Sequence, residues 1–116
     1  YARLRIENSI LYFEYKPTQI KGVALAKRIV SDRLQFQKGR PYPVLCDARR
    51  LIDADKFARD ILAYEGTLLT TAISFLVQPI TNKARAEFFV QSNIPLVPTG
   101  IFTDESSALA FLMPFT

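Results

Sequence analysis

The chain opens with two short runs of a strand-like pattern. In residues 2–7 (ARLRIE), apolar and charged residues alternate, which is the period-two pattern of a half-buried strand. Asn8 and Ser9 are turn-forming residues, and residues 10–15 (ILYFEY) form a second apolar run that Pro17 ends. The pattern predicts an antiparallel β-hairpin.

A helical pattern follows from about Gln19 to Gln37. Thr18 is placed to cap this helix and Gly39 to end it. The residues that recur at helical spacing, with charged residues opposite, are Val23, Ala26, Ile29, Val30 and Leu34. We expect these side chains to form the buried face.

The next pair of elements is a strand and a helix. Residues 41–47 (PYPVLCD) are almost continuously apolar, as in a strand buried on both faces of an α/β sheet. Asp53 is a suitable N-cap for the helix that follows, and Gly66 lies near its end. The predicted buried side chains of this helix are Ala54, Phe57, Ala58, Ile61 and Leu62.

The alternation then repeats. Residues 71–77 (TAISFLV) predict a buried strand that Pro79 closes, and Thr81 is placed to cap a helix that runs to about Ser92. The residues of this helix that we expect to face inward are Ala84, Phe88 and Phe89.

The last two elements are a short strand and a helix. Thr99 to Phe102 predict a strand at the edge of the sheet, because prolines precede it. Thr103 is expected to cap the final helix, with Asp104 and Glu105 in its positive first turn. Its predicted buried residues are Ala108, Leu109 and Leu112.

The order ββαβαβαβα predicts a single α/β domain over residues 1–116. Strands that alternate with helices form a mostly parallel sheet, because right-handed crossovers return each strand beside its predecessor. The N-terminal hairpin adds the antiparallel part. A length of 116 residues is typical of one domain.

The composition excludes several classes of site. Histidine is absent, which removes Ser-His-Asp and Cys-His catalysis and zinc sites built on His and Cys. The four glycines are far apart, so no phosphate-binding glycine loop exists, and no cofactor is expected. A single cysteine forms no internal disulfide, which favours a cytoplasmic protein. No apolar run approaches the ~20 residues of a membrane span.

The net charge of +4 comes from the first half of the chain. Its basic residues, such as Lys27, Arg28 and Arg33, are scattered along one helical pattern, and we interpret them as a solvated helix face. No aromatic residues alternate with basic ones as on an RNA-binding sheet, so nucleic acid is not an expected partner.

The order of elements and several short motifs resemble the STAS-like domains of the SpoIIAA-like superfamily. The matching pieces are CDAR, with Asp47 and Arg49, the strand AISFLV, the segment EFFVQSNIPLVPTGIF and the closing FTDESSALAFL. The superfamily includes anti-sigma factor antagonists and the cytoplasmic modules of sulfate transporters. The chain is most similar to its small uncharacterised bacterial members. The resemblance implies this fold and a regulatory role in protein–protein interaction.

One departure from the superfamily bears on function. Anti-sigma factor antagonists carry a phosphorylatable Ser or Thr just after the third strand. Here residues 48–54 (ARRLIDA) contain no hydroxyl group. The resemblance therefore does not extend to a switch operated by a kinase.

The segment from Tyr42 to Asp60 is rich in charged residues. Asp47 ends a buried strand, and ligands of open α/β sheets bind beyond such ends. The candidate residues for binding an anion or a partner are Asp47, Arg49, Arg50 and Asp53. The alternative is structural, with Asp47 accepting backbone N–H bonds or pairing with an arginine. Cys46, inside the strand, is interpreted as a small apolar core residue.

Two functions follow. The first is a non-enzymatic interaction module whose partner is another protein or a second copy of the chain, with the C-terminal segment LAFLMPFT as an exposed apolar patch. The second is a carrier of a small apolar or anionic molecule between sheet and helices. The aromatic residues that either line such a cavity or form plain core are Tyr12, Phe13, Tyr15, Phe88 and Phe89.

Overall fold

A computed structural model describes all residues, 1–116, as alternating strands and helices. The elements in chain order are β1 (Ala2–Glu7), β2 (Ile10–Tyr15), β3 (Thr18–Ile20), α1 (Gly22–Gln37), β4 (Tyr42–Asp47), β5 (Leu51–Ala54), α2 (Lys56–Glu65), β6 (Thr70–Leu76), α3 (Lys83–Ser92), β7 (Thr99–Phe102), α4 (Glu105–Leu112) and a 3₁₀ turn (Met113–Phe115). The predicted α/β order is confirmed, with two further short strands, β3 and β5.

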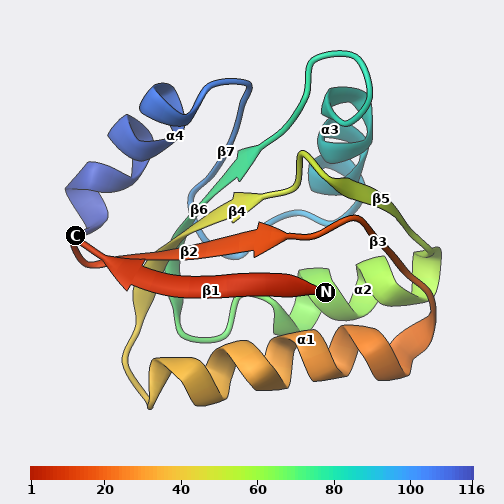
Figure 1. Cartoon of the computed structure of the whole chain (residues 1–116), viewed down its shortest axis with the longest axis horizontal. Helices are drawn as coiled ribbons and strands as arrows, with labels where there is room; N and C mark the ends of the chain where they lie inside the picture. The colour runs from red at the N-terminus through yellow and green to blue at the C-terminus, as the bar shows by residue number, and fades with distance from the viewer.

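The main sheet has the strand order β1-β2-β4-β6-β7 (Figure 1). β1 and β2 are antiparallel, and every other neighbouring pair is parallel. The hairpin turn at Asn8 and Ser9 has φ of 52° and 64°, the left-handed conformations of a type I′ turn. This turn matches the twist of the flanking strands, so the predicted hairpin is confirmed. β7 lies at the edge of the sheet, as expected from its prolines.

Helices α1 and α2 cover one face of the sheet (Figure 1). The core on this face consists of Leu11, Phe13, Tyr15, Ile20, Ala26, Ile29, Val44 and Ala58. The prediction for α1 is partly wrong, because Val23 is exposed and Leu34 only half-buried. Arg33 and Gln37 are buried on this helix instead. On α2, Ala58 is the buried residue, whereas Phe57 faces solvent.

Helix α4 covers the opposite face (Figure 1). Its Ala108 and Leu112 pack against the sheet with Ile10, Leu45 and Ala72. Asp104, one residue after the predicted Thr103, caps the helix and accepts a hydrogen bond from the backbone N–H of Ser107 (2.8 Å). The C-terminal aromatic segment is not an exposed patch, because Phe111 and Phe115 pack against this core.

Strands β3 and β5 form a second, two-stranded parallel sheet. The predicted caps Thr18 and Asp53 therefore lie in strands. Asp55 caps α2 instead, and accepts hydrogen bonds from the backbone N–H of Ala58 and that of Gly22 (both 2.8 Å). These bonds lower the pKa of the Asp55 carboxyl. One carboxylate thus holds the first turns of α1 and α2 together.

Helix α3 differs most from expectation. None of its side chains is buried; Ala84 and Phe88 are exposed, and Phe89 is half-buried. Asn82 precedes the helix in place of the predicted Thr81, and its side chain makes no cap hydrogen bond. Helix α3 therefore lies beside the sheet without closing tightly onto it. No helix of the chain is both long and apolar enough to cross a membrane.

Candidate ligand-binding cavity and the Asp47 corner

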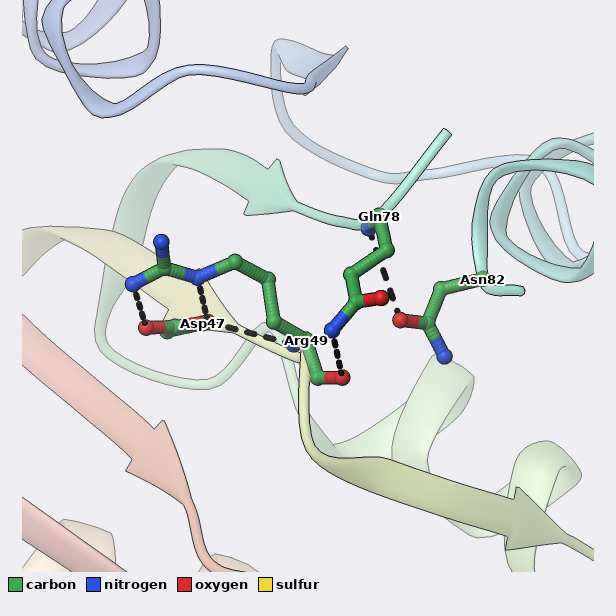
Figure 2. A network of polar contacts seen from close by, with 4 residues as sticks. All are labelled: Asp47, Arg49, Gln78 and Asn82. Atoms are coloured by element: carbon green, nitrogen blue, oxygen red, sulfur yellow. Dashed lines mark hydrogen bonds and ion pairs between the residues drawn. The ribbon is translucent and has the colours of Figure 1, made fainter. Parts of the chain in front are cut away.

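The Asp47 corner, residues 47–50, joins β4 to β5. The carboxylate of Asp47 accepts hydrogen bonds from the Nε (3.0 Å), Nη2 (2.7 Å) and backbone N–H (3.1 Å) of Arg49 (Figure 2). Asp47 is buried, and its hydrogen bonds raise the pKa of the Arg49 guanidinium. The geometry favours the structural interpretation of Asp47, because an external anion has to compete with this carboxylate for Arg49.

Further hydrogen bonds tie the corner to the segment between β6 and α3 (Figure 2). The side chain of Gln78 donates to the carbonyl oxygen of Arg49 (3.3 Å), and its backbone N–H donates to Oδ1 of Asn82 (3.4 Å). Asn82 in turn donates to the carbonyl oxygen of Leu51 (3.2 Å). The corner is therefore held by neutral amides as well as by the ion pair.

The four predicted site residues do not form one site. Asp47 lies on the sheet face that α4 covers in part, where it borders a polar hollow with Arg3, Arg5 and Glu14. Arg50 is exposed. Asp53 lies on β5 and lines a different cavity. The residues are close in sequence, but only Asp47 lies on β4; Arg49 and Arg50 lie in the turn that follows, and Asp53 lies on β5 in the second sheet.

We expect Asp47→Ala to lower the free energy of unfolding by about 1–3 kcal/mol, because a buried hydrogen-bonding carboxylate is lost. Urea unfolding monitored by circular dichroism measures this change. The matched control is Glu7→Ala, which removes the partner of Arg5 in an exposed ion pair and should change stability by less than about 1 kcal/mol. Equal effects of the two substitutions would contradict a structural role for Asp47.

A mostly apolar cavity of about 420 Å³ lies on the other face of the sheet. Of its 29 lining residues, 19 are hydrophobic, and they come from the sheet and from all three helices on this side. The strands supply Phe13, Tyr15, Val44, Cys46, Ile73 and Phe75, and Val77 directly follows β6. The helices supply Ile29, Val30, Leu62, Ala63, Ala84, Ala86, Phe88, Phe89 and Val90. Tyr12, one of the predicted aromatic residues, faces the opposite side and is absent from this lining.

The position of α3 explains why this space is not filled. The large side chains of Ile73 and Phe75 on β6 point toward α3 but stay half-buried. Phe75 meets Phe89 edge to face, with ring centroids 6.0 Å apart. The helix thus contacts the sheet through aromatic edges, and the volume beneath it remains open.

One end of the cavity lies beside Arg33. Its side chain, only 5% exposed, donates to the carbonyl oxygens of Leu68 (3.0 Å) and Gly66 (3.1 Å), to Oγ1 of Thr70 (3.3 Å) and to Oε1 of Gln37. Burial lowers the pKa of this guanidinium. Our interpretation of Arg33 as part of a solvated face is therefore wrong. A usable signal was its spacing, because Arg33 continues the apolar stripe three residues after Val30.

The other end of the cavity lies near the Asp47 corner. Asp53, Asn82 and Arg85 line it there, and the side chain of Arg85 donates to the carbonyl oxygen of Ile52. Arg59 donates to the carbonyl oxygen of Ala54 (2.7 Å). The charged groups at this end are thus of mixed sign. No group of three or more potential metal ligands occurs in the structure.

Comparisons with known proteins agree on the fold. The profile of a family described as a domain of unknown function, DUF7793, matches residues 4–116. Among solved structures, the chain is similar to an uncharacterised protein of the DUF3478 family with a SpoIIAA-like fold from Shewanella loihica PV-4. The TM-score is 0.68 at 14% identity, over 96% of this chain and 93% of that chain. The predicted SpoIIAA-like fold is confirmed. No curated protein matches the chain significantly.

Proposed function

The chain belongs to the DUF7793 family of domains of unknown function, and we propose that it is a non-catalytic module that binds one small apolar molecule. The single observation that supports this function is the cavity between the sheet and helices α1, α2 and α3, with its 19 hydrophobic residues. Pockets that bind small molecules are concave and mostly apolar, with a few polar groups that orient the ligand. This cavity has those properties.

The volume sets the size of the ligand. Each water molecule takes up ~30 Å³ in the liquid, so a cavity of about 420 Å³ has room for roughly 14 non-hydrogen atoms. A bound molecule of this size would contact aromatic rings from both walls, such as Phe13 on β2 and Phe89 on α3. The ligand class is therefore a small, largely apolar compound.

Binding fits the side chains better than catalysis does. The charged residues near the cavity hold the chain in place, as Arg59 and Arg85 do through hydrogen bonds to backbone carbonyl oxygens. Cys46 also lines the cavity, but burial raises the pKa of its thiol to about 12, so it remains protonated and poorly nucleophilic at neutral pH.

Native mass spectrometry of gently purified protein, compared with the same sample denatured, tests this function. We expect a mass in excess of the chain that is lost on denaturation. We also expect the neutral fluorescent probe 1-aminoanthracene to bind in a one-to-one ratio, with the increase in emission that an apolar environment causes. Protein that carries no extra mass and does not bind the probe would contradict the proposal.

A second candidate is an interaction module, and one feature favours it. Large apolar side chains are exposed along residues 80–96, around α3: Ile80, Phe88, Ile94 and Leu96, of which Ile80 is 94% and Ile94 84% exposed. Exposed apolar side chains of this kind are typical of interfaces when they gather into one patch. In this candidate function two copies of the chain associate through this segment. The same native spectra test it, because a dimer mass is expected then and a monomer mass contradicts it.

A further inference from the structure

Arg33 is a buried cation without an anionic partner. It takes part in none of the salt bridges of the structure, and all four acceptors of its hydrogen bonds are neutral. Its Nε–H makes no hydrogen bond, and its Nη2 donates only once. A charge buried in this way is costly unless an opposite charge compensates it.

Tyr15 brings a second uncommitted donor to the same cavity. Its side chain is 5% exposed, and its hydroxyl group makes no hydrogen bond with another residue. Burial raises the pKa of this phenol, and the charge of Arg33 lowers it. Tyr15 and Arg33 both line the cavity, and Tyr15 lies on β2 two residues after Phe13, the neighbour of Cys46 on β4.

The protein supplies no carboxylate at this end of the cavity. Arg33 bonds to Thr70, where β6 begins, and to Gly66 at the end of α2. The only acidic residue that lines the cavity is Asp53, which follows the opposite end of β4. The cavity thus combines apolar walls with an uncompensated positive charge at one end.

We propose that the ligand is a medium-chain carboxylic acid whose carboxylate binds Arg33 and Tyr15 and whose aliphatic chain lies against β4 and β6. This inference rests on the proposed function and names its ligand class. A carboxylate accepts two parallel N–H bonds from a guanidinium, here from Nε and Nη2, and its remaining lone pairs suit the Tyr15 hydroxyl. The volume of about 420 Å³ holds the carboxylate and a chain of about ten carbons, at ~30 Å³ for each non-hydrogen atom.

Competition against bound 1-aminoanthracene tests the inference at neutral pH. The competitors are decanoate, decanol and decylamine, which share one chain and differ in the charge of the head group. We expect decanoate to bind roughly tenfold or more tightly than decanol, because a hydrogen bond to a charged group adds this much. Decylamine is expected to bind most weakly, since its ammonium group meets the charge of Arg33.

Two variants then test whether the carboxylate head group binds at Arg33 and Tyr15. Tyr15→Phe removes only the hydroxyl group, and we expect it to weaken decanoate about tenfold while decanol binds as before. The control is Tyr64→Phe, the same substitution at an exposed position of α2. Arg33→Lys keeps the charge but not the paired N–H donors, and it should also weaken decanoate selectively. Because Arg33 holds the loop after α2, circular dichroism must first show that this variant folds, and Tyr15→Phe remains decisive if it does not.

The outcomes separate the inference from the function on which it rests. If the probe binds but decanoate and decanol compete equally, or Tyr15→Phe affects them equally, the head-group site is wrong and the apolar binding function stands. If neither the probe nor any competitor binds, the binding function itself is wrong, and the ligand class with it.

Discussion

Ala63→Phe is expected to reduce the affinity for 1-aminoanthracene and decanoate at least about tenfold, which corresponds to ~1.4 kcal/mol of binding free energy. Ala63 lies on α2 and its side chain lines the cavity. α2 is held in place by Ala58, which is completely buried against α1. A phenyl ring at position 63 therefore takes up space that the ligand needs. Fluorescence titration measures the loss.

The stability of this variant provides a second readout. Filling an empty apolar space adds buried surface, so the unfolding temperature should stay the same or rise. The matched control is Ala24→Phe, because Ala24 is exposed on α1 and does not line the cavity; its affinities should not change. Undiminished binding by a folded Ala63→Phe protein would place the ligand outside this cavity.

The thiol of Cys46 is expected to react about a thousandfold more slowly with iodoacetamide in the folded protein than in the unfolded chain, because only the thiolate attacks. Burial is the main cause that raises its pKa from 9.0 to about 12, and the charge of Asp47 adds to it. Since Cys46 is the only cysteine, the mass of the intact protein reports the reaction directly.

Unfolding the protein in guanidinium chloride provides the control rate for the same thiol. In the folded protein, the rate should keep rising with pH above 9.0, instead of levelling off near that value. A folded rate within a few-fold of the unfolded rate would show that the surroundings of Cys46 do not raise the pKa of its thiol.

The same shift makes stability depend on pH. A thiol whose pKa is raised by folding stays protonated in the folded chain between pH 9.0 and about 12, while the unfolded chain loses its proton. The contribution of Cys46 is therefore complete below pH 9.0 and is lost as the pH rises toward 12. Urea unfolding of the unsubstituted protein and of Cys46→Ala, at pH values on either side of 9.0, measures how much Cys46 contributes to this pH dependence of the free energy of unfolding.

The candidate site was only partly accessible to sequence analysis. Phe13, Tyr15, Phe88 and Phe89 were predicted either to line a cavity or to form core, and all four line the cavity. Phe13 and Tyr15 are also part of the core. Arg33 was misassigned because its charge suggested a solvated face, although its spacing after Val30 places it on the apolar stripe of α1. Its burial depends on Gly66 and Leu68, more than thirty residues away.

The sequence by itself determined the features that depend on near neighbours. The turn at Asn8 and Ser9, the apolar run of β4 and the alternation of strands and helices follow from turn chemistry and from the period at which apolar residues recur. The α/β class follows in turn, because such an order leaves few ways to pair the strands.

Only the tertiary structure decided features that depend on contacts between distant segments. The chain around Asp53 pairs with β3, so that Asp55 rather than Asp53 caps α2. The amphipathic pattern of α3 predicted a buried face, but no residue of this helix is buried. A cavity is the space left unfilled when the helices pack on the sheet, and the pattern of one helix does not predict that space. The size of the cavity therefore depends on the packing of the whole domain, and the apolar space remains open because no residue of α3 is buried against the sheet.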